Sequence, residues 1–476
     1  MSTPIYSAVK NYCEAEKLRL HMPGHVGGRG IPAPELKAMA ALDVTEVPGL
    51  DDLHLPGTVI QEAAFLMAEA YGARESFFLV NGATSGIHAL FMSLQPASAK
   101  VLLPRNAHRS FFGGMVLAAT SPVYIPCQLD PVLGTALSVA SEDIADLLAL
   151  NPDAQAVFIT SPSYYGSCCD IISIAKAARV ANTLLLVDEA HGGHFPFHRD
   201  YPRPALQAGA DAVVNGLHKT LPVLNQGACL HLGGNFPDRD RVFAAYSLLT
   251  TTSPSYPILA SLDLARQLMQ ESGETWLDKA LHLADEYRKK INNLQGLHCY
   301  GEAEMQQIPG VKEVDPLKLI IMPEGLRING IELAQILRES YKIEVEAADK
   351  RFILAMMSMF HEREDWERLY QSLKDTAGQY AGGREGELKP ELPPKPQLKF
   401  NPREAFFAAS KTVRLQDSRG LIAAEMVAPY PPGVPCLLPG ELIGPEVFSY
   451  LEYLQKNEIH MQGPHDPSLN YIKVID

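Results

Sequence analysis

The sequence predicts an α/β protein in which a large domain holds a mostly parallel sheet, a smaller domain is α+β, and a further domain follows at the C-terminus. From about Ser76 to Leu232, short aliphatic or β-branched runs alternate with alanine-rich amphipathic stretches, the pattern of repeated βα units. Later, residues 381–397 are rich in Gly, Pro and charge and lack apolar periodicity, which is typical of a linker. The 476 residues also exceed what one hydrophobic core normally organises. We therefore expect two or three domains.

These patterns divide the chain into five consecutive segments. We expect an N-terminal arm at residues 1–52, a large domain at 53–295, a small α/β domain at 296–380, a linker at 381–399 and a C-terminal domain at 400–476.

The candidate strands of the large domain mostly lack period-two alternation, as expected when helices cover both faces of a sheet. Right-handed crossovers place the loops that follow the strand ends along one edge, where we expect the chemistry to gather. A helical stretch at about 258–294 leads to the small domain, and a proline-dense run, 429–435, lies in the C-terminal domain. The candidate strands are residues 77–80, 101–104, 123–125, 156–160, 184–187, 212–215 and 228–231.

Composition excludes several classes of function. The formal net charge is −14 and no basic tract is present, which argues against a nucleic-acid partner. The first residues lack the apolar run of a signal peptide, and no later stretch is long and apolar enough to span a membrane, so we expect a cytoplasmic protein. The seven cysteines are scattered without paired CxxC spacing, which favours reduced thiols over disulfides or a zinc site.

Lys219 is the first candidate for chemistry at the predicted sheet edge. It lies in the segment 215–220 (NGLHKT), which follows a strand of buried type. A lysine amine becomes a nucleophile for carbonyl chemistry when its surroundings lower its pKa, and a Schiff base with pyridoxal 5′-phosphate (PLP) is a common reason to bury one. Taken alone, a lysine after a strand is more often a solvated loop residue.

Asp188 ends a hydrophobic strand about thirty residues before Lys219. A carboxylate bonded to the pyridine nitrogen of PLP keeps that nitrogen protonated, and the cationic ring then accepts the electrons of a broken Cα bond. The alternative is an aspartate that caps the next helix. His191 and His194 follow at intervals of three, which raises the alternative of a zinc site. Two glycines interrupt any common helical face, so we expect no bound metal.

Two further strand ends complete the set. The turn at 81–86 (NGATSG) joins a strand to a helix start, where small residues and free N–H groups suit a phosphate, although a simple tight βα connection would look the same. His108 follows the next strand and could stack on a pyridine ring, although such a histidine is more often a cap or surface residue. The four elements together supply every part that a PLP site requires.

With these motifs in place, the sequence resembles the Orn/Lys/Arg decarboxylases, which are PLP enzymes of the aspartate-aminotransferase fold (fold type I). The resemblance covers nearly the whole chain. It rests on the segments 20–25 (LHMPGH), 49–53 (GLDDL), 81–86 (NGATSG), 188–191 (DEAH), 218–220 (HKT), 252–256 (TSPSY), 429–435 (PYPPGVP) and 438–441 (LPGE).

The resemblance implies a role for each matched residue. Family members often have a serine three residues before the lysine, where this chain has Gly216, so Asn215 is the candidate to replace its contact with the phosphate. The other implied roles are Lys219 as the Schiff-base lysine, Asp188 on the pyridine nitrogen, His108 stacked on the ring, and Ala83, Thr84 and His218 on the phosphate.

The resemblance also implies an assembly. The segment 252–256, with Ser253, would reach the phosphate held by a neighbouring subunit, so a homodimer is the smallest expected active unit. The sequence looks like the short form of the family, which lacks an N-terminal receiver-like domain, and we therefore expect a dimer or tetramer.

The implied activity is PLP-dependent decarboxylation of arginine, lysine or ornithine to an amine used in polyamine metabolism, with arginine favoured. Lys219 and His191 are candidates to protonate the α carbon. A basic side chain needs an acid in its pocket, and Glu425 and Glu346 are the candidates, the latter at the end of an expected strand, 343–346. The alternatives are another fold-type I enzyme, such as an aminotransferase or lyase, and a non-catalytic PLP-binding regulator.

Overall fold

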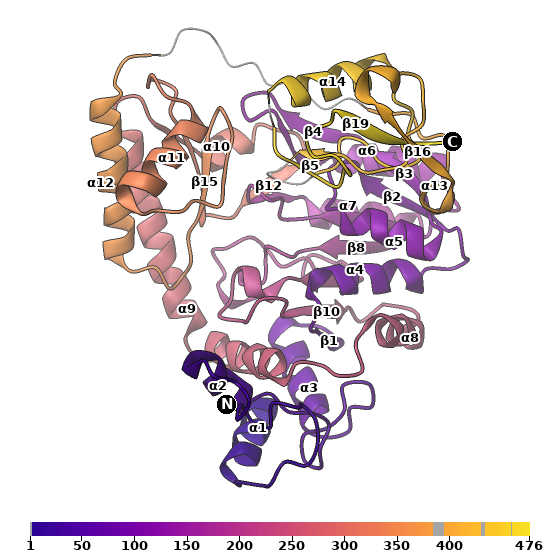
Figure 1. The fold of residues 1–476 in the computed structure, drawn as a ribbon, viewed down its shortest axis with the longest axis vertical. Coiled ribbons are helices and arrows are strands. Elements are labelled where there is room, and N and C mark those ends of the chain that lie inside the picture. The colour runs from indigo at the N-terminus through magenta and orange to yellow at the C-terminus, as the bar shows by residue number, and fades with distance from the viewer. Residues whose placement is uncertain (1, 384–394, 430–433, 458) are drawn as a thin grey trace. The chain divides into compact units, whose positions relative to one another are not determined.

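The computed structural model describes residues 2–383, 395–429, 434–457 and 459–476 (Figure 1). Most of the expected linker, residues 384–394, and part of the proline-dense run, residues 430–433, lie outside the described residues. The chain forms two compact units, each made of separate stretches: Met1–Ser93 with Leu184–Leu277, and Leu94–Thr183 with Asp278–Asp476. The five expected segments do not coincide with these units, and their boundaries stay predictions.

The first unit contains four hydrogen-bonded strands in the order β1-β10-β9-β8. β8 and β9 are parallel, whereas β10 runs antiparallel to both β9 and β1. The antiparallel β10 differs from the expected parallel arrangement because the β9–β10 connection contains only a single short 3₁₀ helix, too little for a crossover. The strands are β1 (Glu75–Leu79), β8 (Leu184–Asp188), β9 (Ala212–Asn215) and β10 (Ala228–Leu232).

Helices cover this part of the sheet. α4 packs on β1, β9, β10 and α8 (Figure 1). Its approach is close, because a Cβ at Gly86 would come within 2.7 Å of Leu79 Cδ1 and 3.1 Å of Val214 Cγ1. The helices are α3 (Val59–Tyr71), α4 (Gly82–Ser93), α8 (Arg239–Leu249), the start of α9 (Tyr256–Asn292), and the 3₁₀ helices η1 (Phe195–Phe197) and η2 (Leu217–Lys219).

The N-terminal arm contains two helices that the sequence analysis missed, α1 (Pro4–Glu14) and α2 (Pro34–Ala41). Both begin with proline, which suits a first helical turn because the missing N–H has no partner there. In α1 the buried side chains Ile5, Val9 and Tyr12 recur at helical spacing. This periodicity was present in the sequence, although only over three turns.

A polar loop before α3 is organised by Asp51. Its carboxylate accepts hydrogen bonds from the backbone N–H groups of Asp52, Gly57, Thr58 and Ile60 at 2.9–3.2 Å. Burial alone would raise the pKa of Asp51, but these hydrogen bonds outweigh it and lower the pKa below its usual value. Asp51 thereby caps α3 from outside the helix, in place of a side chain at its own N-cap.

We expect Asp51→Ala to lower the free energy of unfolding by about 2 kcal/mol, because four backbone donors lose their acceptor. Urea titration monitored by circular dichroism measures this. Because the folded pKa is depressed, the contribution is present above the unfolded pKa and is lost as pH falls through the folded pKa. Asp51→Asn, which keeps one acceptor oxygen, should lose less. Equal stability of Asp51→Ala and the unmodified chain at neutral pH would contradict this account.

The second unit contains a three-stranded parallel run, β6-β2-β3, with helices between its strands. A hairpin of β4 and β5 follows β3, and β7 pairs with β12. The elements of this part are β2 (Lys100–Pro104), α5 (Ser110–Ala118), β3 (Ser121–Ile125), β4 (Cys127–Asp130), β5 (Thr135–Val139), α6 (Ser141–Leu150), β6 (Ala156–Thr160), β7 (Ser167–Cys169) and α7 (Ile171–Val180).

The same unit includes a four-stranded antiparallel sheet in the order β11-β13-β15-β14, whose strands lie within residues 296–380, the range predicted for the small domain. The expected strand at 343–346 is wrong: this stretch is irregular, and β14 starts one residue later. Glu344 and Glu346 are both exposed there. The elements are β11 (His298–Tyr300), α10 (Glu302–Met305), β12 (Val311–Val314), β13 (Lys318–Met322), α11 (Gly330–Tyr341), β14 (Ala347–Ala348), β15 (Ile353–Met356) and α12 (Arg363–Gln379).

The C-terminal stretch forms its own hydrophobic cluster, in which α14 packs its buried Val447, Leu451 and Leu454 with Ile472 and Val474 of β19. β16 pairs with β19 along five residues of each strand. The elements are α13 (Pro402–Phe407), β16 (Ser410–Arg414), η3 (Leu415–Asp417), β17 (Ala428–Pro429), α14 (Pro445–Lys456), β18 (Met461–Gln462) and β19 (Tyr471–Ile475).

Every candidate strand of the large domain is present, each within two residues of its expected bounds. None of the helices in the described part of the chain is both long and apolar enough to cross a bilayer. All seven cysteines are free thiols.

Candidate cofactor site

Asp188 and Lys219 lie on neighbouring strand ends of the first unit. Asp188 is the last residue of β8, and Lys219 follows the end of the parallel strand β9 by four residues, on η2. Asp188 is 3% exposed, and its Oδ1 accepts a hydrogen bond from the backbone N–H of Ala190 at 3.1 Å. Burial raises the pKa of Asp188, and the positive charge of Lys219 acts in the opposite direction. The charges of the predicted acid, Asp188, and the predicted amine, Lys219, therefore act on each other.

His191 lies beside the amine of Lys219. Its Nε2 is 3.1 Å from Lys219 Nζ. The turn that carries His191 is closed by a hydrogen bond from Gly192 N to Glu189 O at 2.9 Å. The carbonyl of Gly193, two residues after His191, accepts a hydrogen bond from the Tyr71 hydroxyl at 2.7 Å. The imidazole is thus held on a fixed turn within hydrogen-bond distance of the predicted nucleophile.

The predicted phosphate turn is the first turn of α4. Gly82 has φ +70°, a conformation that favours glycine, and Ala83 is buried while Thr84 is exposed. Ser85 turns its hydroxyl back onto the Gly82 carbonyl at 2.9 Å. The first backbone N–H groups of a helix have no partner within it, so this turn offers donors and the positive end of the helix dipole to an anion.

Residues 226 and 227 join this turn to His218. Gln226 O accepts from Gly82 N at 2.8 Å, and Gly227 O accepts from His218 N at 3.1 Å. The same Gly227 carbonyl lies 3.0 Å from His218 Nδ1. Because a carbonyl only accepts, Nδ1 carries the proton. Burial lowers the pKa of His218, and with Nδ1 on the carbonyl its Nε2 can donate to a phosphate only when the ring is protonated.

Asn215 lies next to these residues, but its amide is directed elsewhere. It is fully buried, and its Nδ2 donates to Glu189 O at 3.0 Å and to Glu189 Oε2 at 3.1 Å. A phosphate contact by Asn215 therefore stays a prediction, with the amide nitrogen already bound. At Gly216 a Cβ would lie 3.0 Å from Ala190 O, so the serine common in the family would require Ala190 to shift slightly.

Ser253 lies on an exposed segment of the same unit. Its backbone N–H donates to Thr251 Oγ1 at 3.2 Å, and the two hydroxyls are also 3.2 Å apart. The segment ends at Tyr256, whose hydroxyl donates to Asp51 O at 2.7 Å. The motifs 49–53 and 252–256 are therefore in contact, and Ser253 is accessible. Its contact with a neighbouring subunit stays a prediction.

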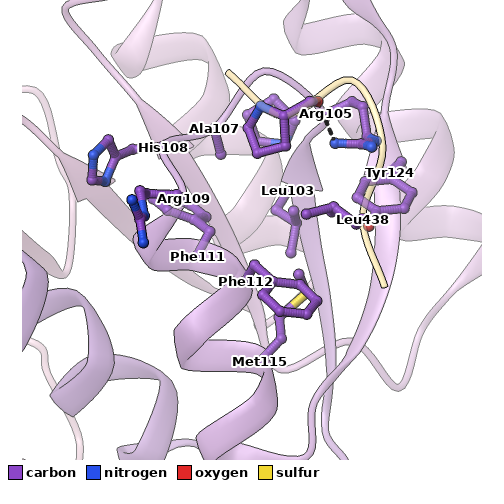
Figure 2. A pocket seen from close by; sticks show the side chains of 12 residues that line it. Leu103, Arg105, Ala107, His108, Arg109, Phe111, Phe112, Met115, Tyr124 and Leu438 are labelled. Atoms are coloured by element: carbon purple, nitrogen blue, oxygen red, sulfur yellow. Dashed lines mark hydrogen bonds between the residues drawn. The ribbon is translucent and has the colours of Figure 1, made fainter. Parts of the chain in front are cut away.

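His108 lies in the second unit, at the start of α5. Its Nδ1 is 2.9 Å from Ser110 Oγ and accepts from Ser110 N at 3.3 Å, and the residue is exposed. Figure 2 shows a pocket at this strand end, with His108 at one side and Arg105 and Tyr124 at the other. Arg105 donates to Pro435 O and to the fully buried Glu441, both at 2.8 Å, which fixes the C-terminal domain against the loop that carries His108.

The two candidate substrate acids also lie in the second unit, in different settings. Glu346 is exposed, and its Oε1 accepts from the Tyr164 hydroxyl at 2.7 Å. Glu425 is 8% exposed, and its two oxygens accept from the backbone N–H groups of His465 and Lys473, each at 2.7 Å. Glu425 therefore has a role in holding the C-terminal domain together, whatever else it does.

The residues of the first unit fit PLP. A buried carboxylate, an amine whose charge acts on it and the N-terminus of α4 supply the partners that the pyridine nitrogen, the aldehyde and the phosphate need. Nothing lies within 4 Å of the position of a Cβ on Gly82, so the approach to the turn is open. Within the described ranges no three His, Cys, Asp or Glu side chains are grouped as a metal site requires.

Sequence reasoning missed Glu189, Gln226 and Gly227. Glu189 was visible as the second acid of the motif 188–191, but nothing in the pattern said that its side chain would bind Asn215. Gln226 and Gly227 contribute backbone carbonyls, which any residue type supplies. For this pair the sequence offered one signal, Gly227, a glycine directly before the strand β10.

Comparison with known proteins gives a consistent result. Residues 3–365 match the family described as Orn/Lys/Arg decarboxylase, major domain, and residues 390–465 match Orn/Lys/Arg decarboxylase, C-terminal domain. The chain is 35% identical to an arginine decarboxylase of Bacillus subtilis, over 99% of this chain and 98% of that protein. It is 34% identical to an arginine decarboxylase of Halalkalibacterium halodurans, over 99% and 97%. A constitutive lysine decarboxylase of Escherichia coli is 23% identical, over 95% and 77%.

Solved structures are similar in fold. The Francisella novicida lysine decarboxylase LdcF aligns with a TM-score of 0.83 at 19% identity, covering 100% of this chain and 81% of that one. A ureidoglycine-glyoxylate aminotransferase of Bacillus subtilis aligns with a TM-score of 0.57 at 16% identity, covering 74% and 92%. At these identities the likeness shows the fold alone, and it confirms the fold-type I architecture expected from the sequence.

Proposed function

The chain belongs to the Orn/Lys/Arg decarboxylase family, and from this premise we propose that its substrate is arginine, which it converts to the corresponding amine and carbon dioxide. The protein is a PLP-dependent decarboxylase of a basic amino acid. The observation that favours arginine is the similarity to arginine decarboxylases at 35% and 34% identity over nearly the full length of each chain. The similarity to lysine decarboxylase is lower, at 23%.

PLP, when bound, supplies a cationic ring that accepts the electron pair of the bond to the departing carboxylate. Lys219 would hold the cofactor through its amine, and Asp188 would keep the pyridine nitrogen protonated. The turn at Ala83 and Thr84, with His218, would bind the phosphate, and His108 would lie on the ring. The position of each residue at a strand end or helix start supports these assignments, and for Asp188 and Ala83 burial supports them as well.

The pair of His191 and Lys219 provides the proton for the final step. Their nitrogens are 3.1 Å apart, so a proton on one is within reach of the other. Once carbon dioxide has left, either group can deliver this proton to the α carbon of the substrate. The hydrogen bond from Gly192 N to Glu189 O holds the backbone turn that carries His191.

A carboxylate must pair with the guanidinium of arginine, because an unpaired buried cation is costly. Glu346 is accessible and binds one phenol, whereas both oxygens of Glu425 already hold backbone donors. We expect Glu346→Gln to raise KM for arginine by about tenfold or more with kcat little changed, the loss typical of a charged hydrogen bond. Glu425→Gln should act mainly on stability. Steady-state kinetics and thermal unfolding of both variants measure this, and the reverse outcome would assign the role to Glu425.

We also propose that the active unit is at least a homodimer, with Ser253 reaching the phosphate of the neighbouring subunit, or a homotetramer built from such dimers, and that it works in the cytoplasm. The exposed Ser253 segment and the free thiols support these proposals. Light scattering during gel filtration measures the assembly.

The experiment that tests the proposed substrate is a panel of arginine, lysine and ornithine, with carbon dioxide and product amine identified by mass spectrometry. We expect arginine to give the highest kcat/KM. A higher kcat/KM for lysine or ornithine would overturn the substrate. Keto acid in place of amine would indicate an aminotransferase, and bound PLP without turnover would indicate a regulator.

A further inference from the structure

Glu189 is a buried carboxyl that directly follows Asp188 and has no part in the chemistry described so far. It is 3% exposed. Its backbone N–H donates to Val214 O at 2.9 Å, which extends the β8–β9 pairing by one step beyond the strand. Its Oε1 accepts from the backbone N–H of Ala205 at 2.8 Å. Hydrogen bonds therefore fix both the backbone and the carboxyl group of Glu189 at the sheet edge that carries the candidate site.

Asn215 connects Glu189 to the segment of Lys219. One amide nitrogen, Asn215 Nδ2, donates both to the carbonyl and to the carboxyl Oε2 of Glu189, at 3.0 and 3.1 Å. An amide has two N–H groups, so both are used on this one residue. Asn215 is the last residue of β9, and η2 with Lys219 starts two residues later. The position of η2 therefore depends on what holds Asn215.

The turn with His191 also closes around Glu189. Glu189 O accepts from Gly192 N at 2.9 Å, in addition to the amide of Asn215. A Cβ at Gly192 would lie 2.7 Å from Glu189 Cγ, so the chain passes against this side chain. Only glycine fits there without a shift of Glu189. One residue thus contacts the three segments that carry Asp188, His191 and Lys219.

The surroundings of Glu189 oppose its ionisation. Burial raises the pKa of Glu189 to about 8, hydrogen bonds from Ala205 and Asn215 act against this, and the neighbouring Asp188 adds to it. Burial also raises the pKa of the Tyr71 phenol, and the charge of Glu189 adds to this shift. Burial raises the pKa of Asp188 as well, so the two adjacent carboxyls share the cost of ionisation. Asp188 is the group that a protonated pyridine nitrogen needs.

We propose that Glu189 is a positioning residue of the cofactor site, which sets the relative placement of Asp188, His191 and Lys219 through its contacts with Asn215, Ala205 and Gly192. It touches neither substrate nor cofactor in this role. The proposal rests on the proposed function, because it assumes that PLP is bound at Lys219. It differs from a purely structural role in that its loss changes the environment of the cofactor and not only the stability of the fold.

The test compares Glu189→Gln with a matched control, Asp263→Asn. In Glu189→Gln an amide NH₂ group replaces one acceptor oxygen. This donor then faces another donor, either Ala205 N or Asn215 Nδ2. Asp263 is also a fully buried carboxylate of the first unit, and it accepts from Ile5 N, Tyr6 N and Arg266. Both variants lose a buried acceptor, but Asp263 holds α1 and not the strand ends. Holoenzymes are measured for PLP affinity, the pH midpoint of the visible PLP absorption, kcat, KM and melting temperature.

We expect Glu189→Gln to weaken PLP binding and lower kcat by about tenfold each, with the absorption midpoint moved by about half a pH unit or more, as displaced reacting groups would produce. Asp263→Asn should lower the melting temperature and leave the other quantities unchanged. If Glu189→Gln changes only the melting temperature, the proposal is overturned while the proposed function stands. If the unmodified chain holds no borohydride-reducible PLP at Lys219, the proposed function itself fails, and that measurement is made first.

Discussion

Lys219→Ala is expected to abolish decarboxylation, with kcat/KM lower by at least about 10³-fold. The amine of Lys219 has two tasks, attachment of PLP and proton transfer, and a proton-transfer group alone commonly contributes about 10²–10⁴-fold. Alanine performs neither. The position of Lys219 on η2, within 3.1 Å of His191 and in the electrostatic reach of Asp188, is the geometric basis for this expectation.

The measurement has two parts. Release of carbon dioxide from labelled arginine gives kcat/KM, and borohydride reduction followed by peptide mass spectrometry identifies the lysine that carries PLP. Lys176→Ala is the matched control, because Lys176 is an exposed lysine on α7 and has no place in the proposed site. Undiminished carbon dioxide release by Lys219→Ala, or a PLP adduct on another lysine, would remove the basis of the mechanism.

The strand ends of the site could be predicted from the sequence because each follows an uninterrupted apolar run. Such runs lie in a sheet covered on both faces, and the residue after the run must then lie at the edge. Asp188 and Lys219 were expected at the ends of strands along one sheet edge for this reason, and the structure has them after the adjacent parallel strands β8 and β9. The turn at Gly82 was visible because glycine marks a backbone conformation with positive φ.

Contacts between side chains could not be predicted in the same way. The pairing of Glu189 with Asn215 depends on the register of β8 against β9, which a single sequence does not contain. The antiparallel direction of β10 depends on a connection too short for a crossover helix, although its strand was correctly expected. The expected strand at 343–346 failed because alternating Glu and hydrophobic residues also suit an exposed irregular segment.

Asp188→Asn is the second substitution with a large expected effect. The amide keeps the size of the carboxyl but cannot carry the negative charge that holds a proton on the pyridine nitrogen, so kcat should fall by about 10²–10³-fold, the usual cost of removing one preorganised electrostatic partner. PLP should remain attached to Lys219. Steady-state kinetics and borohydride trapping on the same preparation measure both quantities. Asp170→Asn, which alters the cap of α7, is the control for a general loss of stability.

The raised pKa of Asp188 leads to an expectation for stability that is opposite in sign to the expected loss of activity. This difference distinguishes a catalytic role of Asp188 from a structural one. Burial raises the pKa of Asp188 in the folded protein, so the folded state binds the proton more tightly than the unfolded state. Stability of the PLP-free protein therefore falls as pH rises from the unfolded pKa through the folded pKa, so burial of this carboxyl opposes folding at neutral pH. Asp188→Asn removes this cost. We expect the PLP-free variant to melt at the same temperature as the unmodified chain or higher, although it is nearly inactive. A large drop in melting temperature together with the loss of activity would instead make Asp188 a structural residue, and the acid that supports the pyridine nitrogen would have to be sought elsewhere.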